Sequence, residues 1–431
     1  MEFPHLQTSL AQLLSSVRPA TARILDRALS DNDIDIDEAA YLFDVDGSDL
    51  LAIIAAADYL RSRTVGDVVT YVVNRNINFT NVCVKACGFC AFSRGHLAEE
   101  GYFLPIEEII RRATEAHELG ATEVCVQAGL APGMDGWHYV KLCRAVKEAS
   151  PDLHVHGFSP EEVLYGATLT GASIREYLLA LKEAGVGSLP GTSAEILVDN
   201  IRQQLSPGRI STNQWIELIQ TAHEVGIPTT STIMYGHIES SHDKAIHLGI
   251  LRDIQRRTGG ITEFVPLSFV YEEAPMFHRR RLAGLRQGAS GAEVMKMYAV
   301  SRLVLNRWIP NLQVSWVKEG PKLSQVALLA GANDFGGTLI NESISTAAGA
   351  GYGQLMKPSQ FRSLIREMGR VPAERSTTYQ RRRVFQTGEN QDDLLDGIKE
   401  PAERFGSYQH LIGLKEYRFR DFYRQQKEPK Q

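Results

Sequence analysis

The stretch VVTYVVNRNINFTNVCVKACGFC, residues 68–90, joins a β-strand pattern to a cluster of cysteines. Its first part, 68–78, begins with the β-branched and aromatic residues that favour strands. Cys83, Cys87 and Cys90 follow within eight positions, and the chain has five cysteines in all. The stretch therefore predicts a strand that runs directly into a loop carrying three neighbouring thiols.

Downstream of this strand, short apolar runs alternate with longer amphipathic segments of helical periodicity. The expected strands are 68–78, 123–129, 153–159, 187–191, 228–236, 263–270, 312–317 and, with the weakest pattern, 332–337. Eight such alternations fit a parallel barrel, whose typical size is about 250 residues, better than an open sheet. We therefore expect an α/β fold of the TIM-type (β/α)8 class. A partial, six-stranded barrel is the alternative.

Two extensions flank the barrel, which we place at residues 65–360. Residues 1–64 carry apolar side chains at three- and four-residue spacing and predict an N-terminal helical extension. Residues 361–431 are more polar and predict a C-terminal helical extension with a tail.

Composition narrows the class of protein. Of 431 residues, 43% are hydrophobic and 23% are charged, which is typical of a soluble globular protein. The net charge of −5 gives no reason to expect nucleic acid or a membrane as a partner. The N-terminus lacks the pattern of a secretory signal, and no apolar run approaches the ~20 residues that cross a bilayer. Together with the clustered, odd-numbered cysteines, this predicts a cytoplasmic protein.

The three thiols are placed for chemistry, because active sites of parallel barrels lie at the carboxyl ends of the strands. Thiolates suit zinc, copper(I) and iron–sulfur clusters. A structural zinc site needs four ligands, so His96 would have to complete the set here. Cys125 and Cys143 stand in a strand and a helix pattern and are expected to pack as apolar residues. The triplet more naturally holds a cubane [4Fe–4S] cluster with one open iron.

The spacing C-x3-C-x2-C, with Phe89 before the last cysteine, resembles the signature of the radical S-adenosylmethionine (SAM) superfamily. The resemblance implies that Cys83, Cys87 and Cys90 bind a [4Fe–4S] cluster and that SAM chelates the fourth iron. It further implies a low-potential electron donor, which drives cleavage of SAM to a hydrogen-abstracting 5′-deoxyadenosyl radical. A closed barrel suits this chemistry because it excludes competing reactions.

Further motifs narrow the resemblance over roughly residues 60–380. They are NRNINFTNVC, HGFSPEEV, PGTSAEIL, STIMYGHIE, TEFVPLSFV and INESISTAAGAGYGQ. They resemble the subgroup that makes deazaflavin and futalosine-derived menaquinone. FSPEE at 158–162 and the NESIS…AGA…GQ stretch at 341–354 favour the second component of FO synthase.

That family implies a specific reaction. It removes hydrogen from L-tyrosine, breaks the Cα–Cβ bond and adds the 4-hydroxybenzyl fragment to 5-amino-6-(D-ribitylamino)uracil. FO synthase subunit 1 then cyclises the product to the deazaflavin FO, which makes that subunit the expected functional partner. The nearest alternatives are two futalosine-pathway enzymes, dehypoxanthine futalosine cyclase and aminofutalosine synthase. A non-catalytic zinc-binding scaffold is a remote alternative.

The resemblance also implies cofactor contacts at the strand ends. Gln127 and Gly129 occupy the place of a turn that binds the SAM amino group. Glu195 resembles the acid that receives the ribose hydroxyls, although it could instead cap the following helix. Trp215 stands where related enzymes often have an arginine for the SAM carboxylate, so that partner is unassigned. The other expected cofactor-binding residues are Phe89, Ser159, Tyr235 and Glu239, and the candidates that face the lumen are His156, His237 and Glu263.

Overall fold

The first strand of the barrel consists of two pieces, β1 (Val68–Val72) and β2 (Asn74–Ile77). The computed structural model describes residues 15–85, 87–279, 282–386, 388, 392–421 and 423. From β2, parallel pairing continues through β3 (Glu123–Val126), β4 (His154–His156) and β5 (Val186–Ser188). A parallel bridge between Leu189 and Thr229 carries the sheet on to the next strands.

The second half of the barrel begins with the parallel pair β6 (Thr229–Tyr235) and β7 (Ile261–Ser268). Two bridges, Phe264 to Leu312 and Gln313 to Asp334, insert a very short seventh strand between β7 and β8 (Asp334–Gly337). Because β8 pairs in parallel with β1, eight strands close on themselves. The predicted TIM-type barrel is confirmed, including its weakest strand, and the six-stranded alternative is wrong.

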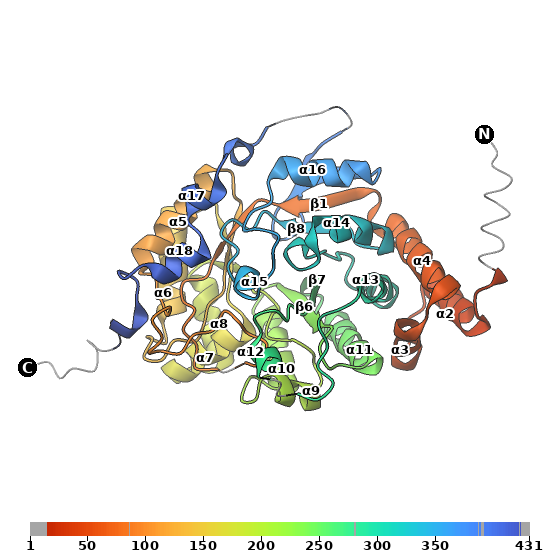
Figure 1. Cartoon of the computed structure of the whole chain (residues 1–431), viewed down its shortest axis with the longest axis horizontal. Coiled ribbons are helices and arrows are strands. Elements are labelled where there is room, and N and C mark those ends of the chain that lie inside the picture. Colours follow the sequence, from red (N-terminus) through yellow and green to blue (C-terminus); the bar gives the residue numbers. More distant parts are fainter. Residues whose placement is uncertain are drawn as a thin grey trace, which may run out of the picture.

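Helices surround the barrel (Figure 1). They are α5 (Ile106–Glu118), α6 (His138–Ala149), α7 (Pro160–Thr170), α8 (Ile174–Glu183), α9 (Asp199–Leu205), α10 (Thr212–Glu224), α11 (Ser241–Thr258), α13 (Gly291–Leu305), α14 (Trp316–Ala327) and the 3-10 turn η1 (Leu328–Ala330). Two short helices, α12 (Pro275–His278) and α15 (Ile344–Ala347), instead lie in the loops that follow β7 and β8. Several of the surrounding helices begin at a serine whose hydroxyl accepts the backbone N–H three residues later, which satisfies a donor that the helix leaves unpaired. Ser159, Ser173, Ser211, Ser240 and Ser290 cap helices in this way. Among the described residues, none of the helices is long and apolar enough to cross a membrane.

The N-terminal extension forms a helical layer outside the barrel. It contains α2 (Pro19–Leu29), α3 (Ile36–Asp44) and α4 (Gly47–Val65). Helix α3 packs on α11 and α4 packs on α13, at one side of the molecule (Figure 1). Residues 1–14, part of the helical extension predicted at 1–64, lie outside the described residues.

The C-terminal extension adds two strands to the expected helices. Its elements are α16 (Pro358–Glu367), β9 (Val371–Arg375), β10 (Arg381–Val384), η2 (Leu394–Gly397), α17 (Pro401–Phe405) and α18 (Tyr408–Gly413). Strand β9 runs parallel to β1, and β10 returns antiparallel to β9. The end of β9 and the turn after it carry Arg375 and Thr377, respectively, to the barrel interior. Within the predicted tail, residues 387, 389–391, 422 and 424–431 lie outside the described residues. The domain boundaries after residues 64 and 360 stay predictions.

Candidate active site

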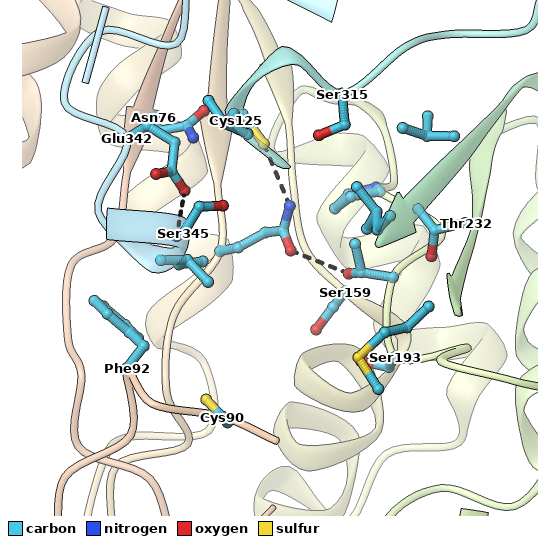
Figure 2. A pocket seen from close by; sticks show the side chains of 18 of the residues that line it. Asn76, Cys90, Phe92, Cys125, Ser159, Ser193, Thr232, Ser315, Glu342 and Ser345 are labelled. Atoms are coloured by element: carbon cyan, nitrogen blue, oxygen red, sulfur yellow. Dashed lines mark hydrogen bonds between the residues drawn. The ribbon is translucent and has the colours of Figure 1, made fainter. Parts of the chain in front are cut away.

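A cavity of about 420 Å³ occupies the barrel interior. Cys83, Cys87 and Cys90 line it from the loop that follows the first strand. Asn74 and Glu123, at the starts of β2 and β3, line it at a deeper level. Figure 2 shows side chains from several strands turned toward this space. The barrel interior therefore holds a partly open cavity with thiols at the carboxyl ends of the strands.

Backbone hydrogen bonds fix the cysteine loop to neighbouring segments. The Cys83 N–H donates to the Arg94 carbonyl at 3.1 Å, and the Val84 N–H donates to the Leu130 carbonyl at 2.9 Å. Farther along, Gly88 donates to the Leu205 carbonyl at 2.9 Å. These bonds satisfy backbone groups that a buried loop would otherwise leave unpaired. The thiols are thus carried on a positioned loop.

The loop after β3 approaches the cysteine loop too closely for a side chain. A Cβ atom added to Gly129 would lie 2.3 Å from the Val82 carbonyl oxygen. The Gly129 N–H donates to the Thr80 carbonyl at 2.9 Å, so this donor serves the packing of the two loops. Gln127 lies beside it in the cavity lining, and its side-chain oxygen accepts a hydrogen bond from the Thr192 hydroxyl at 3.0 Å.

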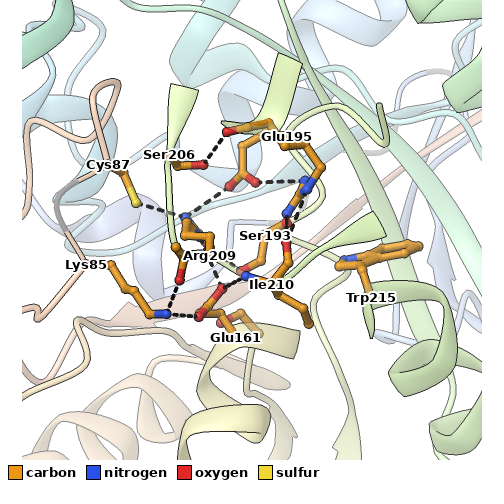
Figure 3. Close-up of polar contacts among 12 residues, drawn as sticks. Lys85, Cys87, Glu161, Ser193, Glu195, Ser206, Arg209, Ile210 and Trp215 are labelled. Carbon is orange, nitrogen blue, oxygen red and sulfur yellow. Dashed lines mark hydrogen bonds and ion pairs between the residues drawn. The ribbon is translucent and has the colours of Figure 1, made fainter. Parts of the chain in front are cut away.

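Arg209 forms the centre of a charged cluster next to Cys87 (Figure 3). Its guanidinium lies 3.5 Å from the Cys87 sulfur, 3.1 Å from Glu195 Oε1 and 3.3 Å from Glu161 Oε2. Arg202 pairs with the other Glu195 oxygen at 3.3 Å. Glu195 thus pairs with two arginines. It does not cap α9, so that alternative is wrong.

Arg209 was missed in the sequence because it precedes α10 instead of standing on it. Trp215, which stands where the resemblance suggested an arginine, is buried, and its indole N–H donates to the Thr192 carbonyl at 3.0 Å. It therefore supports the turn after β5. No spacing rule in the chain singles out Arg209, since a loop residue reaches the cavity only through the path of its backbone.

The three thiols of the loop have the chemistry that an iron–sulfur cluster requires of its ligands. Burial raises the pKa of the Cys87 thiol to about 12 and also raises the pKa of Cys90, and the Arg209 charge opposes the shift at Cys87. Iron binding would remove those protons, because the ligand is the thiolate. Among the described residues, no three His, Cys, Asp or Glu side chains are arranged to hold one metal ion. Three thiols on one cavity wall, with a guanidinium beside them, fit a cluster in which each thiolate binds a different iron.

The structure places most of the predicted site residues at the cavity. It is lined by five predicted cofactor contacts, Phe89, Gln127, Gly129, Ser159 and Glu195, and by two of the candidates expected to face the lumen, His156 and Glu263. Ser159 also caps α7 and donates its hydroxyl to Glu162 Oε2 at 2.5 Å. The Glu162 carboxylate also accepts the Ala128 N–H at 2.9 Å, and burial raises the pKa of Glu162 to about 7. Glu162, which had not been predicted, joins the loops after β3 and β4.

Three predicted residues, at the end of β6 and in the turn after it, do not line the cavity in the part of the chain that the structure describes. The cavity lining includes Met234 but not Tyr235, because successive strand side chains alternate between faces. The Tyr235 hydroxyl instead donates to Glu319 at 3.0 Å. Glu239 accepts the N–H groups of Gly236 and His237 at 2.7 and 2.8 Å, respectively. His237 and Glu239 therefore stabilise the turn after β6 rather than face the cavity.

Several polar side chains line the deep end of the cavity. Burial raises the pKa of Glu263 to about 7, although Arg375 lies 3.4 Å away and Tyr379 donates to the same carboxylate. His156 shares the Ser188 hydroxyl with His154, each at 2.7 Å. Burial lowers the pKa of His156 to about 4, so its ring is neutral at pH 7. Arg375 comes from β9, beyond the predicted barrel, and only the tertiary structure brings it here.

A closed parallel barrel with three cysteines at the carboxyl ends of its strands defines the class: this is a radical SAM enzyme. Residues 77–248 match the radical SAM superfamily and residues 258–388 match the CofH/MqnC C-terminal region. The hydrogenase maturase HydG from Carboxydothermus hydrogenoformans shares the fold, with a TM-score of 0.64 at 14% identity over 87% of this chain and 85% of that one.

Sequence similarity narrows the class to one family. The 5-amino-6-(D-ribitylamino)uracil–L-tyrosine 4-hydroxyphenyl transferase of Methanothermobacter thermautotrophicus is 50% identical over 364 residues, which is 84% of this chain and 98% of that protein. The transferase of the same name from Methanocaldococcus jannaschii is 50% identical over 345 residues, covering 79% and 95%. The chain belongs to this transferase family, as its motifs predicted.

Proposed function

We propose that this chain transfers the 4-hydroxybenzyl fragment of L-tyrosine to 5-amino-6-(D-ribitylamino)uracil, a step in making the deazaflavin FO. The observation that carries the proposal is 50% identity over 98% of a transferase with that name. The cavity supports it, because it combines a thiol-bearing wall with polar side chains deeper in the barrel. Once substrates occupy such a site, it favours radical chemistry by excluding water and other reactants.

The cysteine loop is the proposed cofactor site. Cys83, Cys87 and Cys90 would each bind one iron of a [4Fe–4S] cluster, with SAM completing the fourth. When bound, the cluster and SAM supply one-electron chemistry that removes hydrogen from a substrate. A low-potential electron donor and a cyclising subunit of FO synthase are the proposed partners in the pathway.

The chain's own residues would orient SAM beside the cluster. Glu195 is 8% exposed and lines the cavity, so its carboxylate is available to ribose hydroxyls while two arginines hold it in place. Arg209 is the proposed partner of the SAM carboxylate, since it carries a positive charge next to Cys87. Gln127 and Ser159 add neutral polar groups to the same wall.

The deep end of the cavity suits the uracil substrate, which carries a polyhydroxylated chain. Hydroxyl groups need both donors and acceptors when they leave water. Glu263, Gln313, Thr230 and the neutral His156 supply them in the cavity lining. In this arrangement the barrel holds the acceptor substrate in position and keeps water away from the reacting carbon.

An anaerobic assay tests the proposal. Purified protein with a reconstituted cluster is incubated with reductant, SAM, L-tyrosine and the ribitylaminouracil, and products are followed by mass spectrometry. We expect a mass equal to the uracil plus the 4-hydroxybenzyl fragment. Turnover of dehypoxanthine futalosine without tyrosine, and no uracil adduct, would instead assign the chain to the futalosine pathway.

A further inference from the structure

Four cationic side chains in the described residues line the cavity: Lys85, Arg209, Lys318 and Arg375. Three of them have anionic partners. Lys85 pairs with Glu161 at 3.2 Å, and Arg209 pairs with Glu195 at 3.1 Å. Arg375 pairs with Asp334 of β8 at 2.5 Å. Within the described ranges, the Lys318 ammonium has neither a hydrogen bond nor an ion pair. Lys318 is half-buried, and a cation partly removed from water without a partner costs free energy. Lys318 is therefore the lining cation that no anion of the described residues neutralises, and it is available to a substrate anion.

Glu342 brings a carboxylate to the same cavity. It is 4% exposed, and its oxygens accept backbone N–H groups from Ser345 at 2.8 Å and Thr346 at 3.3 Å. Figure 2 shows Glu342 beside Ser345 at the edge of the pocket. In the part of the chain that is described, no lysine or arginine pairs with it. Burial lowers the pKa of Lys318, and Glu342 is the foremost charge opposing that shift. The two opposite charges thus face one space without touching.

Lys318 stands on a turn that its neighbours fix. Trp316 is buried and donates its indole N–H to the Gly337 carbonyl at 2.9 Å. Glu319 accepts the Tyr235 hydroxyl. Gly320 then leaves the helical conformation with φ 77°, which separates this single turn from the rest of α14. The lysine therefore does not depend on a mobile segment for its position.

Glu342 is fixed by the rest of the motif that contains it. Its carbonyl accepts a hydrogen bond from the Gln354 side-chain amide at 2.9 Å, which links the NES and GQ parts of the stretch 341–354. Asn341, with φ 63°, accepts a hydrogen bond from Arg75 and donates to the Gly406 carbonyl at 2.8 Å. The carboxylate is thus held on a segment that both the barrel and the C-terminal extension brace.

We infer that Lys318 and Glu342 together bind the zwitterionic end of L-tyrosine, with the ammonium of Lys318 on its carboxylate and the carboxylate of Glu342 on its amino group. The assignment rests on the proposed function for the identity of the amino acid. SAM also carries an amino group and a carboxylate, but the partners proposed for them are the fourth iron of the cluster and Arg209. Charge-assisted pairs of this kind are strong and directional. The pair orients the amino group of tyrosine in the cavity and rejects phenols that lack either charge.

The test removes one charge at a time from the protein and from the ligand. Affinities for L-tyrosine, tyramine and 3-(4-hydroxyphenyl)propionate are measured by anaerobic calorimetry on cluster-loaded, SAM-bound protein. In wild type, tyrosine should bind at least tenfold more tightly than either truncated ligand. Lys318→Met should weaken tyrosine by roughly tenfold to a hundredfold and leave tyramine, which lacks the carboxylate, almost unchanged. Glu342→Gln should likewise weaken tyrosine and spare the propionate, which lacks the amine.

Lys322→Met is the matched control, because Lys322 is exposed on the same helix; its affinities should equal those of wild type. Equal weakening of tyrosine and tyramine by Lys318→Met would overturn the inference, since a general distortion does not depend on the ligand carboxylate. A loss of SAM affinity with unchanged tyrosine affinity would overturn it too and assign the pair to SAM. If wild type neither binds tyrosine nor forms the uracil adduct, the proposed function fails with it. If wild type does both and Lys318→Met keeps its ligand preference, only the inference fails.

Discussion

Gly129 offers a sharp test of how the cavity is built. A Cβ atom at this position would lie 2.3 Å from the Val82 carbonyl oxygen and 2.8 Å from the Val82 carbonyl carbon. Cβ atoms essentially never approach a heavy atom of a residue distant in the chain within 3.0 Å. In Gly129→Ala the two loops must therefore separate by about 0.7 Å, a shift of the kind that overpacked sites undergo.

The cost follows from the rigidity of both loops. Forcing a methyl group into a packed site typically destabilises a protein by about 1–3 kcal/mol. Val82 directly precedes Cys83, so the displacement moves the first thiol away from the other two. We expect Gly129→Ala to lower both the melting temperature and the iron content after anaerobic reconstitution. A lower SAM affinity should follow only as a consequence of the lost cluster.

The assay combines iron and sulfide per chain, thermal unfolding and SAM binding. Gly95→Ala is the control, because Gly95 is exposed in the same region and a Cβ there meets nothing within 4 Å. It should match wild type in all three measurements. If Gly129→Ala kept its iron and its stability but bound SAM poorly, the glycine would be a direct cofactor contact and the packing argument would be refuted.

Three further outcomes are expected. Alanine at any one of the three loop cysteines should abolish SAM cleavage while Cys143→Ala, in the buried face of α6, should retain it; persistent cleavage in a loop variant contradicts the cluster assignment. Glu195→Gln should weaken SAM binding by roughly tenfold to a hundredfold at unchanged iron content, whereas a lower melting temperature with unaltered SAM affinity would leave Glu195 only as a partner of the two arginines. Burial raises the pKa of Glu263 from 4.5 to about 7, so its contribution to folding is present below the lower value and is lost as pH rises toward the higher one. The free energy of unfolding, measured with urea as a function of pH, should show this loss in wild type and not in Glu263→Gln. An identical pH dependence in wild type and Glu263→Gln would rule out a raised pKa at Glu263.

The local patterns of the sequence were sufficient for the class of fold and for the cofactor loop. Strand–helix alternation follows from side-chain periodicity, which each segment expresses by itself. The triplet Cys83, Cys87 and Cys90 is likewise local, since its three thiols lie on one short loop. Strand ends were less certain: the segment predicted at 312–317 contributes only bridges at Leu312 and Gln313, because α14 begins at Trp316.

Alternation along a strand predicts which side chains face inward. Thr230, Thr232 and Met234 of β6 line the cavity, whereas Tyr235, next along the strand, turns toward Glu319. The period of two thus holds to the end of β6, and it gives no direction for the residues of the turn that follows. The functional prediction for Tyr235, His237 and Glu239 relied on position in the sequence, and the turn after β6 uses these side chains for its own hydrogen bonds.

The sequence by itself determined that a parallel barrel carries three thiols at its active end, because both properties belong to short, contiguous segments. Only the tertiary structure decided what surrounds them. Arg209 comes from a loop, Arg375 from a strand outside the barrel, and Lys318 and Glu342 from the seventh and eighth strand ends. These residues meet because the barrel closes and the C-terminal extension pairs with β1. Contacts between residues so distant in the chain depend on backbone paths and packing that no local pattern encodes.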